Sequence, residues 1–291
     1  MAPEIAGVPE RLTQGANASS AGLTWSGNGQ WIAFNEAKVP TRDIYVLPAS
    51  GGALRKVPRA VPLLGGAPWD LGLSSDGSRL AYTTRLEGRS VLQMVSVNTG
   101  ETVMQFGNPD AFEPRFSPDD KHVAYVRHRK WPADPLGEVR VLRLADRSDV
   151  PVTETSVFAR SPAWSSDGSL LAFLAHPDKD DLSVEEVWIT PVLQTGEAAG
   201  EPTKIRLPRF AHSVPGWTAD NKIGLLSTSP DRNAIYTVPL SGGRATQVFP
   251  NGSTHIQAIL PGPSTGPGSY TAPKTCLLSH RIAEIILNQR Q

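Results

Sequence analysis

Five short stretches of the chain repeat one pattern of apolar and polar positions. Each ends an apolar segment, passes through a polar turn and continues with alternating apolar residues; the five read TWSGNGQWIAFN, GLSSDGSRLAYT, RFSPDDKHVAYV, AWSSDGSLLAFLA and GWTADNKIGLLS. The last apolar residue before each turn serves as an anchor, and the anchors are Trp25, Leu73, Phe116, Trp164 and Trp217. They are separated by 48, 43, 48 and 53 residues, and a period of this length indicates a repeat architecture.

The polar turns predict β-hairpins. Asn28-Gly29, Asp76-Gly77 and Asp167-Gly168 stand between apolar segments, and these residue types tolerate the positive φ angles of tight hairpin turns. About twenty residues after each anchor a third β-rich segment follows, such as DIYVLPASGG, and then a fourth, such as TVMQF. Each repeat is therefore predicted to form one four-stranded sheet.

A single small sheet cannot bury both of its faces, so repeats of this length are expected to stack radially as the blades of a β-propeller. Trp25, Trp164 and Trp217 occupy one register of the repeat. Aromatic residues at a fixed repeat register predict packing between neighbouring blades rather than a ligand cage.

The pattern W-S-x-D-G-x-x-hydrophobic-A-F, followed by an I-Y-x-hydrophobic strand that ends in Gly-Gly, resembles the TolB-like β-propeller repeat. The resemblance covers roughly residues 10–260 and implies an all-β fold of the TolB-like propeller type. It says little about function, because the same repeat resembles the periplasmic TolB propeller, the propeller that caps prolyl oligopeptidase-type serine peptidases, and sensor propellers.

Both ends of the chain depart from the repeat. ERLTQG, residues 10–15, resembles a fourth strand with no repeat before it, and HIQAILPGPS, residues 255–264, resembles the start of a sixth repeat with an anchor at Leu260. Together they predict six four-stranded blades, the last one incomplete and closed by the N-terminal strand. We expect the propeller over residues 1–260 and a Pro/Gly-rich segment with a short amphipathic helix over residues 261–291.

Composition lowers the expectation of several partners. The 28 basic and 28 acidic residues cancel, so no global field favours nucleic acid. No apolar run is long enough to span a membrane and no signal-peptide pattern opens the chain, so a cytoplasmic protein is expected, or a periplasmic one if a leader was removed. One cysteine, Cys276, excludes a disulfide framework within the chain, and no cofactor is expected.

The sequence offers one serine motif and no other sign of catalysis. Ser264 lies in GPSTG, which matches G-x-S-x-G, but prolines flank it, no Asp occurs after Asp231, and only His280 follows it. No catalytic residue is therefore assigned, and the resemblance to prolyl oligopeptidases stops before the catalytic domain. Glu185 and Glu186 resemble the paired glutamates of dipeptidyl-peptidase propellers, but their register predicts the entrance of a third strand.

If the four strands alternate in direction, the hairpin turns lie on one face and the loops that enter each first strand lie on the other. We call the second one the funnel face. Its candidate binding residues precede the first strands and should surround the channel mouth; they are Asp70, Glu113, Arg160, His212 and His255. Two histidines are too few to predict a metal site, and all five residues are alternatively read as solvated loop positions.

Two long loops of the funnel face have opposite charge. RHRKWPADPLG, residues 127–137, is basic and HPDKDDLSVEE, residues 176–186, is acidic, so they either neutralise each other across adjacent blades or form a bipolar docking patch. The sequence thus favours a non-enzymatic scaffold that binds a protein or peptide through the funnel face. The alternative is a detached or truncated gating propeller of a prolyl oligopeptidase-type peptidase that lacks its hydrolase domain.

Overall fold

The computed structural model describes strands and turns that together trace a ring. The described residues are 18–36, 43–58, 71–87, 89–106, 110–130, 134–154, 157–178, 185–206, 216–218, 222–229, 232–242, 246–247, 256–259 and 275–277. Within these ranges there is no helix, and so none that could cross a membrane.

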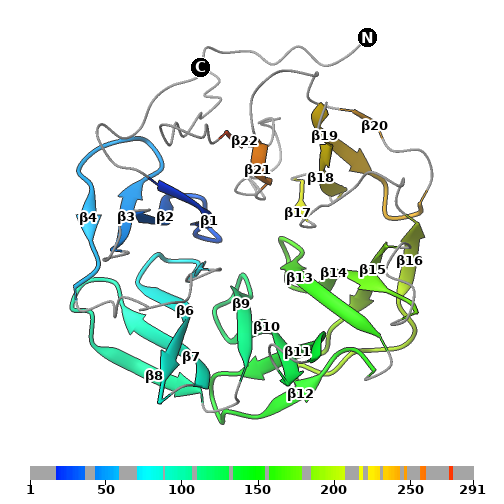
Figure 1. Ribbon diagram of the computed structural model, residues 1–291, viewed down its shortest axis with the longest axis horizontal. Coiled ribbons are helices and arrows are strands. Elements are labelled where there is room, and N and C mark those ends of the chain that lie inside the picture. The colour runs from blue at the N-terminus through cyan, green and yellow to red at the C-terminus, as the bar shows by residue number, and fades with distance from the viewer. Residues whose placement is uncertain are drawn as a thin grey trace.

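The ring consists of consecutive antiparallel sheets arranged around a central axis (Figure 1). Blade 1 contains β1 (Ala18–Trp25), β2 (Trp31–Glu36), β3 (Ile44–Pro48) and β4 (Arg55–Lys56). Blade 2 contains β5 (Leu71–Leu73), β6 (Arg79–Leu86), β7 (Arg89–Ser96) and β8 (Thr102–Phe106). Blade 3 contains β9 (Ala111–Phe116), β10 (His122–Lys130), β11 (Asp134–Arg143) and β12 (Asp149–Pro151). Blade 4 contains β13 (Phe158–Trp164), β14 (Leu170–His176), β15 (Glu186–Pro191) and β16 (Thr203–Arg206). Blade 5 contains β17 (Gly216–Trp217), β18 (Ile223–Ser229), β19 (Arg232–Val238) and β20 (Thr246–Gln247).

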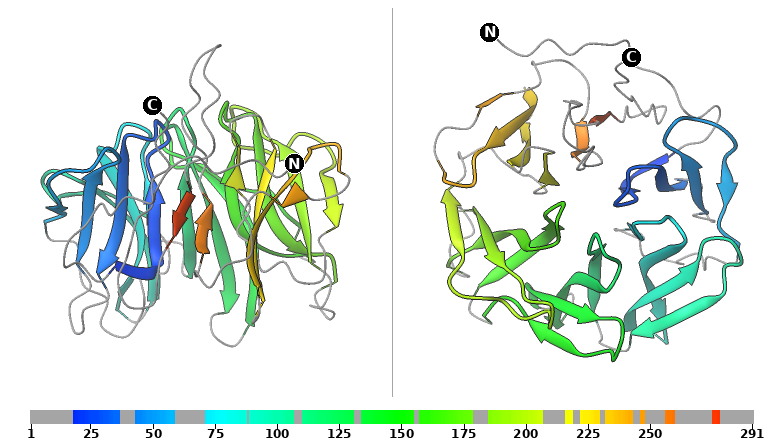
Figure 2. Two further views of the ribbon diagram at one scale, coloured as in Figure 1. Left: turned by 90° about the horizontal axis from the view of Figure 1, so that it is seen from above. Right: turned by 180° about the vertical axis from the view of Figure 1, so that it is seen from behind.

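The described residues form five four-stranded blades, where the sequence predicts six with the last one incomplete. A two-stranded sheet of β21 (Ile256–Ile259) and β22 (Thr275–Leu277) lies between blade 5 and blade 1, in the sixth position of the ring (Figures 1 and 2). The partner of β21 comes from beyond PGPSTGPGSYTAP, a stretch too rich in Gly and Pro to continue as a regular strand. The predicted N-terminal strand at residues 10–15, the anchor Leu260 and the predicted helix lie outside the described residues.

Each of the five anchors is the last residue of the first strand of its blade, as the repeat predicts. After the anchor, a serine hydroxyl donates to an Asp or Asn side chain two residues on; these pairs are Ser26–Asn28, Ser74–Asp76, Ser117–Asp119 and Ser165–Asp167, at 2.6 to 2.7 Å. The same serine oxygen accepts the N–H of the first residue of the second strand or its neighbour, as in Leu170 N to Ser165 Oγ at 2.9 Å. The repeated serine thus closes the hairpin corner.

The hydrophobic core lies between blades rather than within them. Each of four clusters draws side chains from two consecutive blades; Val46 of blade 1 packs in the same cluster as Leu80 of blade 2, and Val139 of blade 3 in the same cluster as Phe173 of blade 4. This arrangement follows from the small sheets, which can bury an apolar face only against a neighbour.

Trp164 and Trp217 pack between neighbouring blades, which confirms the role predicted for these two anchors. The indole Nε1 of Trp164 donates to the carbonyl of Arg115 at 3.1 Å, across the boundary between blades 3 and 4. Trp217 is completely buried at the next boundary. A buried tryptophan of this kind combines a large apolar surface with a directional polar contact.

Candidate functional site

Two of the five predicted binding residues lie within the described structure, and they are neighbours. Glu113 belongs to β9 and Arg160 to β13, the innermost strands of blades 3 and 4. Both residues lie inside the strands, whereas the sequence placed them in the loops before them. Asp70, His212 and His255 lie outside the described residues, and their place at the channel mouth stays a prediction.

A bulge in each inner strand brings the two residues together. The strand register shifts near Glu113 and between Arg160 and Ala163, and Glu113 and Ser161 both have a φ of 56°. The carboxylate of Glu113 accepts a hydrogen bond from the backbone N–H of Ser161, the residue after Arg160. Bulges re-aim side chains and leave backbone groups outside the strand ladder, and here one such group is bound by the adjacent blade.

The guanidinium of Arg160 is held by a largely enclosed carboxylate of its own blade. Its Nη2 donates to Oε1 of Glu185, which lies directly before β15. Nε2 of His176, the last residue of β14, lies 3.4 Å from the same oxygen, and the ring of Phe158 stacks on His176 with centroids 5.2 Å apart. The Glu185 side chain is 11% exposed and that of Arg160 is 30% exposed, so the acid is enclosed while the cation reaches solvent.

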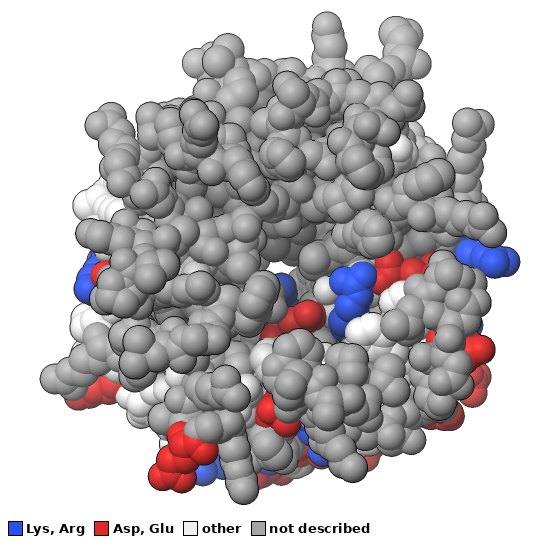
Figure 3. Space-filling view, viewed as in Figure 1, with Lys and Arg blue, Asp and Glu red and all other residues white. Residues whose placement is uncertain are grey.

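We call Glu113, Arg160, His176 and Glu185 the channel-mouth cluster. Figure 3 shows acidic and basic side chains side by side next to the central opening of the ring, where β9 and β13 come closest to the axis. The cluster joins two blades: Glu113 belongs to blade 3, and the other three residues belong to blade 4.

β9 is also tied to the blade on its other side. Nη1 of Arg115 donates to the carbonyl of Leu71 in blade 2 at 3.3 Å. The innermost strand of blade 3 therefore sends a cationic side chain to one neighbour and an anionic side chain to the other. These contacts fix the channel wall on which the cluster sits.

The basic segment 127–137 is a hairpin arm rather than a loop. β10 continues to Lys130 and β11 begins at Asp134, with Arg127 paired to Glu138 and His128 to Gly137. The charged side chains gave no apolar alternation, because this part of the hairpin extends beyond the core. The end of β10 and the start of β11 could therefore not be predicted from the sequence pattern.

Two charged side chains of the long segments, Arg127 and Glu185, are neutralised within their own blades. Arg127 Nη2 lies 3.1 Å from Glu138 Oε2 in blade 3, and Arg160 pairs with Glu185 in blade 4. Residues 131–133 and 179–184 lie outside the described structure, so neutralisation across the two segments stays a prediction. Glu185 and Glu186 do not act as a pair, because Glu186 accepts from the indole of Trp188 at 2.9 Å.

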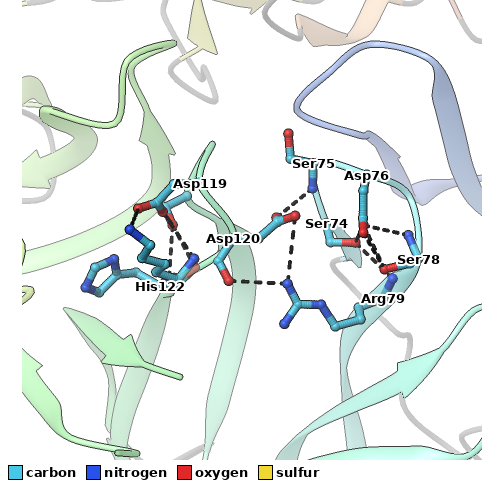
Figure 4. Close-up of polar contacts among 10 residues, drawn as sticks. Ser74, Ser75, Asp76, Ser78, Arg79, Asp119, Asp120 and His122 are labelled. Carbon is cyan, nitrogen blue, oxygen red and sulfur yellow. Dashed lines mark hydrogen bonds and ion pairs between the residues drawn. The ribbon is translucent and has the colours of Figure 1, made fainter. Parts of the chain in front are cut away.

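On the opposite face, which carries the hairpin corners, polar side chains hydrogen-bond to other groups of the same face. In Figure 4, Asp120 of blade 3 accepts the N–H of Ser75 of blade 2 at 2.6 Å, and its backbone carbonyl accepts from Arg79 at 3.3 Å. Asp120 has a φ of 57° at the turn position where blades 1, 2 and 4 have glycine. Burial raises the pKa of its carboxyl, against the lowering effect of the Ser75 N–H and of Arg79.

The corner aspartates have the opposite shift. Hydrogen bonds from Ser165 and from the N–H of Ser169 lower the pKa of Asp167. At Asp76, burial raises the pKa, but hydrogen bonds from Ser74 and Ser78 outweigh it and the net shift is downward. These carboxylates are engaged in the turns and belong to the fold rather than to a binding surface.

No three His, Cys, Asp or Glu side chains meet as metal ligands in the portion of the ring that the structure describes. The cluster has one imidazole and two separate carboxylates, each already bound to a protein group. Its chemistry is therefore that of charged recognition, with a fixed cation flanked by fixed anions.

Two features of the site were not evident from the sequence. Glu185 meets Arg160 only because the second and third strands of blade 4 return it to the first, and Ser161 exposes its N–H only because of the bulge. The repeat register predicts Glu185 at the entrance of the third strand, and this is the one sequence signal for its position.

The ring of radially stacked antiparallel sheets places the chain in the class of β-propeller proteins. Known structures narrow this class. TolB from Acinetobacter baumannii matches with a TM-score of 0.59 and 17% identity, over 75% of this chain and 51% of that chain. A protein assigned as TolB in Agrobacterium tumefaciens matches with a TM-score of 0.61 and 18% identity, over 79% of this chain and 80% of that chain.

Prolyl oligopeptidase B from Galerina marginata matches with a TM-score of 0.56 and 14% identity, over 86% of this chain and 37% of that chain. The fold is thus that of a TolB-like β-propeller, which the prolyl oligopeptidase also contains. The chain spans about half the length of the Acinetobacter protein. No protein-family model matches the sequence, and no curated protein matches it either.

Proposed function

We propose that this chain is a non-enzymatic β-propeller scaffold that binds a protein or peptide through its funnel face. The observation that carries the proposal is the channel-mouth cluster. Glu113 of blade 3 binds the backbone of Ser161, and Glu185 of blade 4 binds the guanidinium of Arg160. The Arg160 side chain nevertheless remains 30% exposed. Rigid, partly exposed charges on fixed elements suit the recognition of a partner.

The contrast with the hairpin face supports this choice of side. There, the carboxylates of Asp76, Asp119 and Asp167 are bound within their own turns. Such groups offer few free acceptors to another molecule.

The test is capture of a partner from lysate of the source cells. We expect the double variant Arg160→Ala, His212→Ala to lose the partner. A matched control on the hairpin face is Gln30→Ala, Lys121→Ala, since both side chains are exposed and neither closes a corner. If the control variant loses the partner and the funnel variant retains it, the partner binds the hairpin face and the proposal is wrong.

The second candidate is the detached or truncated gating propeller of a prolyl oligopeptidase-type peptidase. It is supported by the match to the Galerina enzyme, of which this chain covers 37%. The reading frame downstream of residue 260 in the gene discriminates the two candidates, because a hydrolase domain there would favour the second. A cytoplasmic location, or a periplasmic one after removal of a leader, is part of the proposal and is checked by cell fractionation.

We further propose that residues 10–15 complete the closing sheet beside β21 and β22. The support is the two-stranded sheet itself, which leaves strand positions to fill where the other blades have four strands. A closed ring protects sheet edges that would otherwise pair with other chains.

A further inference from the structure

Two described arginines that lie among carboxylates, Arg140 and Arg160, differ in how their guanidinium groups are held. Arg140 of β11 is bracketed: its Nε donates to Asp149 at 3.0 Å, and its Nη1 donates to Glu138 on the other side. Its side chain is 11% exposed. A guanidinium has five N–H donors in a planar fork, so it readily accommodates two carboxylates at once.

Arg160 has only half of that arrangement. Among the described residues its one hydrogen-bond partner is Glu185, through Nη2, and its side chain is nearly three times as exposed as that of Arg140. The other N–H donors of Arg160 have no hydrogen-bond partner among the described residues. One edge of the fork is thus fixed by the protein and the other is available.

The neighbouring groups hold this fork in place. Glu185 is largely enclosed and lies beside His176, which stacks on Phe158, so the carboxylate that orients Arg160 is itself confined. Glu113 binds the backbone immediately after Arg160 from the adjacent blade. An arginine fixed in this way loses less conformational freedom on binding than a free surface arginine does.

The charges of the cluster also restrict the partner. Arg160 is balanced by Glu185, and Glu113 places a second carboxylate on the uncharged backbone N–H of Ser161, the residue after Arg160. A small free anion would be repelled by that carboxylate. A segment that brings its own cation next to its carboxylate would satisfy both Arg160 and Glu113.

We propose that the channel-mouth cluster binds an Asp or Glu side chain of a peptide segment, with the open edge of Arg160 as the donor, and that Glu113 favours a Lys or Arg beside that residue. This inference rests on the proposed function of the funnel face. In the complex, Arg160 takes the bracketed arrangement that Arg140 has within the protein.

The experiment selects short random peptides from a displayed library on the immobilised full chain. We expect the selected peptides to share an Asp or Glu next to a Lys or Arg. Replacement of that acidic residue by Asn or Gln in a synthetic peptide should weaken binding to the wild-type protein by about tenfold or more, as measured by calorimetry.

Protein variants then locate the contact. Arg160→Gln should cause a similar loss, and combining it with the peptide change should add little, because both changes remove the same interaction. The exchanged pair Arg160→Glu, Glu185→Arg keeps an internal ion pair and should lose the acidic peptides. Lys121→Gln on the hairpin face, whose side chain is 74% exposed, serves as the matched control and should bind as wild type does.

The outcomes separate the two proposals. Selected peptides without a shared acidic residue, or peptides whose binding is unaffected by Arg160→Gln, would overturn the carboxylate site and leave the scaffold function standing. Failure to select any peptide would count against both. If Arg160→Gln lowers the melting temperature, the peptide substitution on the wild-type protein still decides the question.

Discussion

The indole Nε1 of Trp217 donates a hydrogen bond of 2.9 Å to the carbonyl of Ala163, the residue directly before the anchor of the preceding blade. Trp164 makes the same contact with Arg115, which directly precedes the anchor Phe116. The anchor of one blade is thus bonded to the strand end of the blade before it. This register is a property of the boundary between repeats and not of either repeat alone.

We expect Trp217→Phe to destabilise the fold by about 1–3 kcal/mol, because it removes the indole donor from the partly buried hydrogen bond to the carbonyl of Ala163. Urea unfolding followed by circular dichroism measures the change. Trp31→Phe is the control, since Trp31 is partly exposed and packs at the edge of the core. Equal losses in the two variants would show that aromatic volume, and not the hydrogen bond, matters at the anchor.

Acid should weaken the hairpin corners. The folded-state pKa of Asp167 is lowered, chiefly by hydrogen bonds from Ser165 and Ser169, and the pKa of Asp76 and Asp119 is lowered as well. A lowered folded-state pKa contributes stability that is complete above the unfolded pKa of about 4 and is lost as the pH falls through the folded value. The free energy of unfolding should therefore decline below about pH 4.

The control for this pH dependence is present in the chain. Asn28 makes the same corner contacts in blade 1, accepting from Ser26 at 2.7 Å and from the N–H of Gln30 at 2.9 Å. Asp76→Asn with Asp167→Asn should therefore keep the turns and flatten the acid limb of stability. An unchanged acid limb in this double variant would assign the acid sensitivity to other carboxylates.

The contribution of the N-terminus to ring closure can be measured by truncation. Deletion of residues 1–15 should expose an edge of the closing sheet, lower the melting temperature and promote self-association. Deletion of residues 1–9 keeps ERLTQG and should leave both properties unchanged. If both truncated chains melt as the full chain does, the N-terminus takes no part in the ring.

Ser264 should not react as a hydrolase nucleophile. No Asp follows Asp231 and only His280 lies downstream, so the motif lacks the partners that activate a serine in the order Ser, Asp, His. Mass spectrometry after treatment with a fluorophosphonate should find Ser264 unmodified, beside a serine hydrolase that is labelled fully. Stoichiometric labelling that disappears in Ser264→Ala would contradict this.

The fold was readable from the sequence because its signals are local and repeated. Each anchor and the polar turn after it lie within a few residues, and every one of the five anchors ends a first strand. The sequence pattern contains a serine after the anchor but does not reveal its role. The hydrogen bonds of this serine at the hairpin corner explain why it recurs.

The candidate site was harder to predict, because its contacts are neither local nor periodic. Glu113 reaches Ser161 through bulges that no residue pattern announces, and Glu185 returns to Arg160 through two strand reversals. The sequence predicts a sixth blade because HIQAILPGPS begins like a repeat, whereas the described residues at this position form only the two-stranded sheet of β21 and β22.

The sharing of each hydrophobic cluster between two blades sets how the architecture can change in length. Excising one blade would leave an apolar half-surface on each of its two neighbours, and those halves were shaped for different partners. A repeat can be gained or lost only if the surfaces on both sides of the cut match each other. The units of the ring are therefore the interfaces between blades rather than separable blades. Trp164 and Trp217 each donate a hydrogen bond across one of these interfaces.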